Sequence, residues 1–218
     1  MDDKGWTVWA TIWIALTVLL FIGVVSYADI TTAPVDNVVR LAIGSSSGTG
    51  FLLGDGRMIT AKHVVQQCEM VMMAKYSDGT LEIIKKEQIR MSDNYDIAVI
   101  EVKRKGKQLT IFDDDLYVGF PIYTISMPFS EDVRFGSVGV IGSKRTTLEG
   151  RYTWRGVRMA DIHVVGGMSG GPVFNNDDQV VGIIVASSQT IAVIVDNKTI
   201  LEFLDETKTK QTKEVQGN

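Results

Sequence analysis

The chain has 218 residues, 45% of them hydrophobic, which is enough for one good core or two small barrels with a shared interface. The formal net charge of -4 and the lack of a basic stripe with interleaved aromatic residues exclude the nucleic-acid-binding class. The single cysteine, Cys68, cannot form an intramolecular disulfide, and with two histidines it gives no ordinary zinc ligand set. We therefore expect no metal, and no pattern in the chain calls for an organic cofactor.

The N-terminal segment is long and apolar. Residues 5–28 contain no charged side chain and would rise about 36 Å as a helix, enough to cross a hydrocarbon core of about 30 Å. The aromatic residues near its two ends are typical of interfacial anchors, namely Trp6, Trp9, Trp13 and Tyr27. We expect residues 1–28 to be an uncleaved anchor that crosses the membrane through residues 6–27, which makes the chain a single-pass membrane protein.

A cleaved signal peptide is the alternative for this segment, with secretion after cleavage near Ala28. The apolar run is longer than the usual 7 to 15 residues, and the acidic residues before Lys4 leave no positive n-region. Lys4 on one side and Arg40 on the other balance each other under the positive-inside rule. We expect the following domain on the exported side, because hydrophobic N-terminal segments commonly lead export.

Beyond this segment, short runs typical of strands are separated by turns. We expect a linker over residues 29–34 and a folded domain over residues 35–205. The first series of predicted strands covers residues 35–43, 48–53, 57–60, 69–76, 81–90 and 97–102, with a helical turn at 62–66. The second series follows the charged connection 103–107 and covers residues 117–127, 136–143, 152–162, 172–174, 179–186 and 191–195. This pattern predicts an all-β fold of two six-stranded antiparallel barrels, preceded by one transmembrane helix.

After the last strand the chain becomes polar. We expect a short helix over residues 198–204 and a disordered polar tail over residues 206–218.

A glycine-rich turn in the second series surrounds Ser169, within Gly166-Gly167-Met168-Ser169-Gly170-Gly171-Pro172. A serine in such a turn can expose its hydroxyl beside converging backbone N–H groups, because glycines supply the necessary backbone angles. This arrangement suits acyl transfer, in which each N–H that stabilises the oxyanion contributes about 3 kcal/mol. The alternative is a tight turn with a solvated serine.

A nucleophilic serine needs a base, and the chain offers only His63 and His163. His63 follows a predicted strand where the chain leaves the sheet, although a surface histidine is the alternative. The base needs a carboxylate that orients it. Asp96 stands immediately before an apolar strand, with Asp93 as the nearest competitor and an ordinary turn aspartate as the alternative.

Chain order separates the possible folds. The turn also fits the G-x-S-x-G elbow of α/β-hydrolases, but those need a histidine after the serine, and none follows Ser169. The subtilisin order places Asp first on an α/β scaffold, whereas this chain shows few amphipathic helices. The order that remains is His63, Asp96, Ser169, that of chymotrypsin. It places the histidine and aspartate in the first strand series and the serine in the second, so the site would lie between the barrels.

Four motifs in this order resemble trypsin-like serine proteases of the chymotrypsin fold, namely Gly48-Thr49-Gly50-Phe51, Ile59-Thr60-Ala61-Lys62-His63-Val64-Val65, Asp96-Ile97-Ala98-Val99-Ile100 and Gly167-Met168-Ser169-Gly170-Gly171-Pro172. The resemblance is to the disulfide-free bacterial and viral type, which includes high-temperature-requirement and glutamyl-endopeptidase proteases. It implies a serine endopeptidase with Ser169 as nucleophile, His63 as general base and Asp96 as orienting acid. It further implies an oxyanion hole formed by the N–H groups of Gly167 and Ser169.

The chain departs from the secreted digestive members at two positions. Those members carry Cys beside the catalytic histidine and Asp before the serine, where this chain has Val64 and Met168. Because that Asp pairs with a new N-terminus freed by cleavage, Met168 indicates that this activation route is not used.

The resemblance also indicates which residues contact a protein or peptide substrate. His163 has the spacing from Ser169 at which family members place the base of the primary specificity pocket, where a histidine would favour an acidic side chain. A partly buried strand histidine, with an apolar or small pocket preference, is the alternative. Residues Ile184, Val185, Ala186 and Ser187 are expected to pair with the substrate backbone. The alternative function is a catalytically silent, protease-like module that binds peptides on a membrane anchor.

Overall fold

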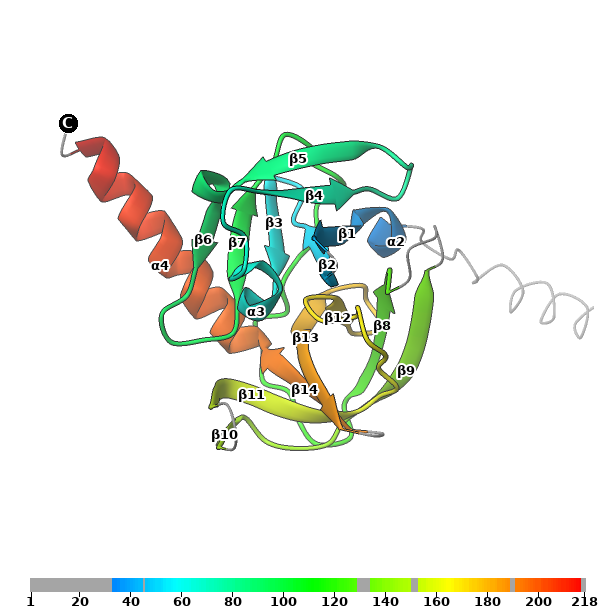
Figure 1. Ribbon diagram of the computed structural model, residues 1–218. Coiled ribbons are helices and arrows are strands. Elements are labelled where there is room, and N and C mark those ends of the chain that lie inside the picture. Colours follow the sequence, from blue (N-terminus) through cyan, green and yellow to red (C-terminus); the bar gives the residue numbers. More distant parts are fainter. Residues whose placement is uncertain (1–32, 45, 129–133, 150–152, 189–190, 217–218) are drawn as a thin grey trace, which may run out of the picture. The chain divides into compact units, whose positions relative to one another are not determined.

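The structure is a computed structural model that describes residues 33–44, 46–128, 134–149, 153–188 and 191–216. Residues 33–218 form one unit, built mainly of two antiparallel sheets (Figure 1). Of the predicted linker, residues 29–34, only residues 33 and 34 are described. The predicted anchor, residues 6–27, lies outside the described residues. Within the described residues, no helix is both long enough and apolar enough to cross a membrane.

The first sheet contains seven strands, one more than predicted, in the order β5-β4-β1-β2-β3-β7-β6. They are β1 (Val38–Ile43), β2 (Ser46–Leu52), β3 (Arg57–Thr60), β4 (Val71–Lys75), β5 (Leu81–Lys85), β6 (Ile89–Met91) and β7 (Ala98–Glu101). The extra strand arises because the predicted strand 81–90 is broken by a 3-10 turn, η1 (Lys86–Gln88). At this turn the Gln88 side chain accepts a hydrogen bond from the Lys85 N–H at 2.9 Å, which bends the chain from one sheet edge towards the other.

The second sheet also contains seven strands rather than six, in the order β10-β11-β14-β13-β12-β8-β9. They are β8 (Pro121–Ser126), β9 (Phe135–Ile141), β10 (Thr146–Leu148), β11 (Trp154–Asp161), β12 (Pro172–Phe174), β13 (Val180–Ser188) and β14 (Ile191–Asp196). The sequence missed β10, whose three residues are too few for an alternating pattern. Pairing between β9 and β11 closes this sheet into a barrel.

Each barrel has its own apolar cluster, and a third cluster joins them. The first barrel packs Leu41, Met58 and Ile100 together, while the second packs Ile141 and Val173. The third cluster combines residues of both sheets with residues of the C-terminal helix, among them Phe51, Ile59, Ile97, Phe174, Ile183, Val195, Ile200 and Phe203. The two barrels therefore share a continuous buried interface.

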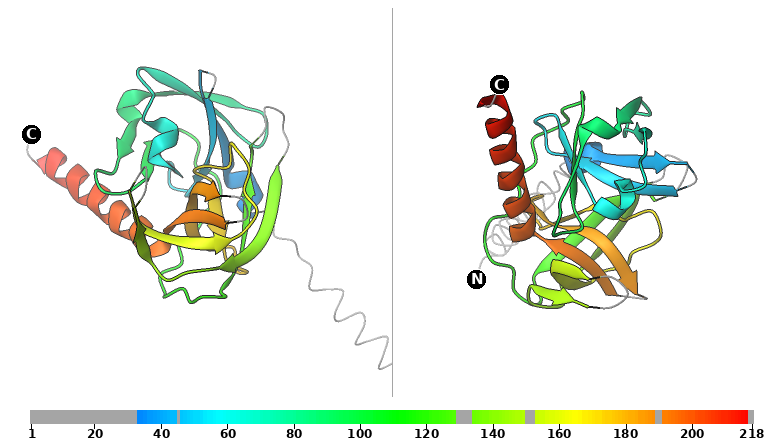
Figure 2. Two further views of the ribbon diagram at one scale, coloured as in Figure 1. Left: turned by 60° about the horizontal axis from the view of Figure 1, so that its bottom comes forward. Right: turned by 60° about the vertical axis from the view of Figure 1, so that its left-hand side comes forward.

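Among the described residues, three α-helices accompany the sheets: α2 (Ala33–Asn37), α3 (Lys62–Val65) and α4 (Asn197–Gln216). The predicted strand 35–43 begins later than expected, at Val38, and its first three residues belong to α2. Helix α4 begins directly after β14 and runs beside the first barrel (Figure 2). It is much longer than the predicted helix 198–204.

The predicted disordered tail is corrected by α4, which continues to Gln216. The buried residues Ile200, Phe203, Leu204 and Thr207 have i, i+3, i+4 and i+7 spacing, so the helix has an apolar face that packs on the barrels. Once this part is packed, helix propagation through the following polar residues is favourable. The Asp196 carboxylate accepts the Lys198 N–H at 2.9 Å and caps the helix start.

Candidate active site

The loop that carries Ser169 connects the segment after β11 with β12, and several of its positions require glycine. Gly167 and Gly170 have φ values of +90° and +84°, which L side chains rarely adopt. A Cβ at Gly170 would lie 2.1 Å from the Thr49 carbonyl oxygen, and one at Gly167 would lie 2.5 Å from that of Pro128. The glycine-rich sequence therefore lets the backbone approach its neighbours closely while Ser169 remains partly exposed.

Hydrogen bonds fix this loop between the two barrels. From the first barrel, the Thr49 N–H donates to the Ser169 carbonyl at 2.8 Å, and the Thr49 hydroxyl donates to the Gly167 carbonyl at 2.8 Å. From the second barrel, Ile184 accepts the Gly170 N–H at 2.7 Å and donates its own N–H to Gly171 at 3.0 Å. Thr49 lies in a motif noted in the sequence, but its contact with the loop is a tertiary feature that local patterns do not encode.

The predicted oxyanion donors, Gly167 and Ser169, are among the loop residues whose N–H groups have no acceptor within the described part of the chain. Met168, Gly170 and Gly171 donate their N–H groups to the carbonyl oxygens of Val165, Ile184 and Met168. Within the described part of the chain, the N–H groups of Gly167 and Ser169 donate to no protein acceptor. These two groups therefore have no competing acceptor there, which donors to an oxyanion require.

His63 and Asp96 lie together because their strands are neighbours. His63 is in α3, directly after β3, and Asp96 precedes β7; these antiparallel strands pair Thr60 with Ala98. The His63 Nδ1 atom lies 2.8 Å from Asp96 Oδ2, and the His63 backbone N–H donates to Asp96 Oδ1 at 2.9 Å. The competing Asp93 is exposed, and the carboxylate in contact with the imidazole is that of Asp96. The structure therefore places Asp96, and not Asp93, against the imidazole.

The Asp96 contact leaves the far nitrogen of the ring for proton transfer. With Nδ1–H donating to the carboxylate, Nε2 carries the lone pair that a general base needs. The His63 side chain is 36% exposed and that of Asp96 is 15% exposed, so the ring faces solvent while the carboxylate lies behind it.

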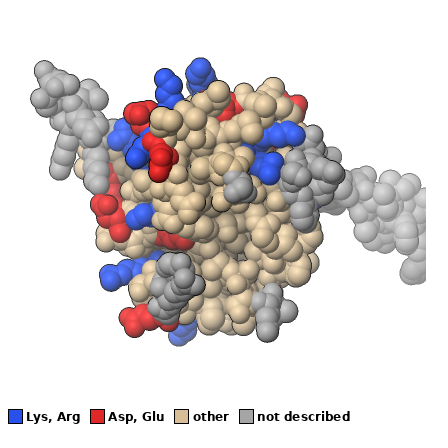
Figure 3. All heavy atoms as spheres, in the orientation of Figure 1, with Lys and Arg blue, Asp and Glu red and all other residues tan. Residues whose placement is uncertain are grey.

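His63 and Ser169 line one cleft, together with Leu41, Ile43 and other residues of the first barrel. The two side chains form no direct hydrogen bond in this structure, and such bonds are often long before substrate binds. In Figure 3, charged side chains lie mainly towards the margins of the face shown, and its middle is formed mostly by other residue types.

The candidate substrate strand divides into two parts. Ile184 is fully buried, and both its N–H and its carbonyl are bonded to the Ser169 loop, so it supports that loop and cannot pair with a substrate backbone. Val185 falls at a register shift between β13 and β14, and it lines a hollow beside His63 and Trp154. Of the four residues predicted to pair with a substrate backbone, Val185, Ala186 and Ser187 remain candidates.

His163 is not brought into the cleft of His63 and Ser169. Its side chain is exposed, its ring centroid lies 5.8 Å from that of Phe135, and its backbone N–H donates to the Ser137 hydroxyl at 3.1 Å. It lines two hollows formed with residues of β8, β9 and β11. The acidic primary specificity inferred from its spacing gains no support from this placement and stays a prediction.

Met168, the departure beside the nucleophile, is fully buried in the second-barrel cluster. Its thioether accepts the Val165 N–H at 3.3 Å and packs among apolar residues where an aspartate would carry a charge, so no ion pair holds the loop at this position.

Two antiparallel barrels with a serine loop, a histidine and an aspartate around their junction define the chymotrypsin-like class of folds. Residues 48–183 match the family described as trypsin-like peptidase domain, and the chain belongs to this family. The match includes His63, Asp96 and Ser169.

Two relatives and one solved structure are similar to the chain. It is 33% identical over 141 residues to a probable periplasmic DegP-like serine endoprotease of Halomonas elongata, covering 63% of this chain and 29% of that protein. It is 28% identical over 177 residues to the serine protease HTRA1 of Xenopus tropicalis, covering 78% of this chain and 38% of that protein. The chain thus spans about a third of the length of these relatives.

The solved structure is that of Rv3671c from M. tuberculosis H37Rv, a serine-to-alanine mutant in its inactive form. The TM-score is 0.70 at 18% identity, covering 85% of this chain and 93% of that one. At this identity the likeness is one of fold.

Proposed function

We propose that this protein is a serine endopeptidase with Ser169 as nucleophile, His63 as general base and Asp96 as the acid that orients it. The observation that carries the proposal is the double contact of Asp96 with His63, through the ring at 2.8 Å and through the backbone at 2.9 Å, in the family of trypsin-like peptidase domains. A surface histidine or an ordinary turn aspartate has no need of this arrangement.

In the proposed reaction, the Ser169 hydroxyl oxygen attacks the substrate carbonyl carbon while its proton passes to His63 Nε2. The N–H groups of Gly167 and Ser169 stabilise the oxyanion. The carbon–nitrogen bond then breaks as His63 returns the proton to the leaving amine, which leaves an acyl-enzyme. A water molecule, deprotonated by His63, hydrolyses this ester and restores the serine.

The proposed substrates are extended segments of proteins or peptides. Main-chain groups of residues 185–187 would pair with the substrate backbone as an added strand, since a strand edge binds extended chains by backbone hydrogen bonds.

A labelling experiment tests the nucleophile directly. The full-length protein is incubated with a fluorophosphonate, and the adduct is located by peptide mass spectrometry. We expect a single adduct on Ser169, because the hydroxyl is activated only beside the base and the oxyanion donors.

Heat-denatured protein serves as the control for this labelling and should remain unmodified. An adduct on another residue would refute the assignment. Folded protein that binds extended peptides but takes up no label would instead establish the silent peptide-binding module.

We also propose that residues 6–27 anchor the protein in a membrane with the peptidase domain on the exported side. The apolar sequence of this segment supports the proposal, as does the periplasmic designation of the Halomonas elongata relative. We expect the protein to sediment with membranes and to stay there in high salt, because apolar burial is not screened by ions.

Detergent extraction is the positive control for this fractionation, and the orientation is read from protease accessibility in intact cells. Release by salt alone would contradict the anchor. A mature N-terminus at Asp29 would show that the segment is a cleaved signal peptide.

A further inference from the structure

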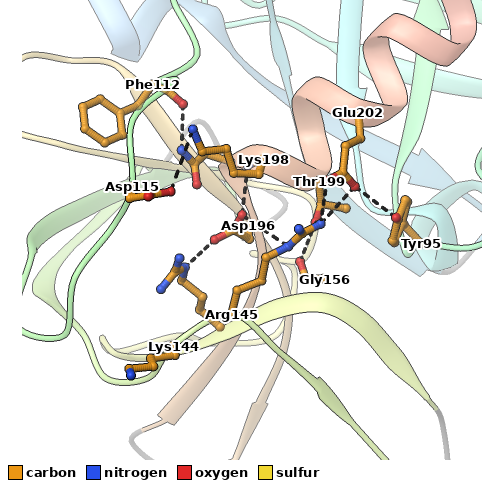
Figure 4. A network of polar contacts seen from close by, with 12 residues as sticks. Tyr95, Phe112, Asp115, Lys144, Arg145, Gly156, Asp196, Lys198, Thr199 and Glu202 are labelled. Atoms are coloured by element: carbon orange, nitrogen blue, oxygen red, sulfur yellow. Dashed lines mark hydrogen bonds and ion pairs between the residues drawn. The ribbon is translucent and has the colours of Figure 1, made fainter.

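The residue before Asp96 is tied to the C-terminal helix. The Tyr95 hydroxyl donates to the Glu202 carboxylate at 3.0 Å, which joins the loop that precedes β7 to α4 (Figure 4). The Tyr95 ring packs against the cluster shared by the two barrels. Partial burial, together with the Glu202 carboxylate, raises the pKa of Tyr95, so its hydroxyl remains a donor.

Glu202 is itself held in place by Arg145 from the segment before β10. The Arg145 guanidinium donates to both Glu202 oxygens at 3.0 and 2.9 Å, and also to the Thr199 hydroxyl at 2.8 Å. The same guanidinium lies 3.7 Å from the buried Asp196 carboxylate at the start of α4 (Figure 4). Glu202 therefore presents a fixed acceptor to Tyr95.

The loop between Tyr95 and the first barrel is short and closed on itself. The Ser92 N–H donates to the Ile97 carbonyl at 3.0 Å, and the Ser92 hydroxyl accepts the Tyr95 N–H at 3.2 Å. Lys62, the neighbour of His63, donates to the Ser92 carbonyl at 2.6 Å. In so short a loop, a displacement of Tyr95 also displaces Asp96.

We propose that Tyr95 and Glu202 are positioning residues for the His63–Asp96 pair, so that α4 holds the aspartate at its distance from the imidazole. This inference rests on the proposed function. The contacts of Glu202 are partly exposed and contribute little to stability. A displacement of about 1 Å at a reacting group can lower a rate by about 100-fold, so their effect on turnover should exceed their effect on folding.

The first test compares the turnover of variants at the two positions. Tyr95→Phe removes only the hydroxyl and keeps the packed ring. We expect kcat to fall about fivefold to tenfold, with KM within about twofold and an unchanged urea midpoint. Glu202→Ala should show the same loss of kcat as Tyr95→Phe. Glu202→Gln should recover part of the rate, because it keeps a hydrogen-bond acceptor. The double variant Tyr95→Phe/Glu202→Ala should lose no more kcat than the single variants.

Asp205→Asn is the matched control, because it removes a carboxylate of α4 whose partner is the exposed Lys208 at 3.7 Å. This variant should keep the kcat of the wild type. Additive losses in the double variant, or an equal loss in Asp205→Asn, would overturn the proposal.

The second readout needs no catalysis. The His63 N–H is bonded to Asp96 Oδ1, so its hydrogen exchange, followed by NMR, reports the Asp96 position. We expect exchange to be about fivefold faster in Tyr95→Phe and Glu202→Ala, with Ile100 of β7 unchanged. Unchanged His63 exchange overturns the inference even if the protein is an active peptidase, and faster exchange supports it even if the protein cleaves nothing.

Discussion

Replacing Asp96 with asparagine should lower kcat for peptide hydrolysis by about 10⁴-fold while leaving the protein folded. The two carboxylate oxygens accept from two donors of one residue, the His63 ring and the His63 backbone N–H. An asparagine has one oxygen and can satisfy only one of them. If the asparagine NH₂ group faces the ring, the imidazole must carry its proton on Nε2, the atom that is needed as the base. If the NH₂ group faces the His63 backbone N–H, two hydrogen-bond donors point at each other.

Asp93→Asn is the matched control, since it makes the same chemical change three positions away on an exposed residue. Steady-state kinetics and urea unfolding are measured for both variants. We expect Asp93→Asn to retain wild-type kcat. A loss of less than about tenfold in Asp96→Asn would contradict the role of Asp96, because an orienting carboxylate contributes far more than that.

Replacing Arg158 with methionine should lower the free energy of unfolding by about 3 kcal/mol. Arg158 on β11 is 6% exposed and forms an ion pair with Asp196, which is fully buried at the end of β14. Without the guanidinium, the carboxylate is a buried charge whose remaining partners are the Lys198 N–H and the more distant Arg145. The loss is measured by urea denaturation.

Two further variants make this stability prediction specific. Arg57→Met breaks an exposed ion pair with Asp55 and should lower stability by less than about 1 kcal/mol. Arg158→Met/Asp196→Asn should be more stable than Arg158→Met alone, because it removes the uncompensated charge and keeps an oxygen that caps α4. If Arg158→Met and Arg57→Met were equally destabilising, burial of the pair would not matter.

The barrels were predictable because their strands are local patterns of apolar residues bounded by turns. Strand β3 (Arg57–Thr60) has the predicted bounds. The predicted strands were wrong where tertiary contacts determine the structure. The 3-10 turn η1 is stabilised by a hydrogen bond to the Gln88 side chain. Strand β10 has three residues and is defined by its pairing with β11. Helix α4 was underestimated because its polar half continues from a packed apolar half.

The candidate site was predictable as residue types in order, but its supports were not. The sequence favoured Asp96 over Asp93 by its place before an apolar strand, and the contact of Asp96 with His63 agrees with that choice. Ile184 fits a substrate edge by position, yet its backbone is bonded to the Ser169 loop. The Tyr95 contact with Glu202 joins residues 107 positions apart, a pairing that no local pattern contains.

The double contact of Thr49 with the Ser169 loop makes the nucleophile dependent on both halves of the molecule. Thr49 belongs to β2, whereas the loop leads into β12, so a small rotation of one barrel against the other would break both bonds at once. The N–H groups of Gly167 and Ser169, the proposed oxyanion donors, belong to the loop that these two bonds hold. If the proposed function holds, docking of the two halves would set the catalytic competence of the loop.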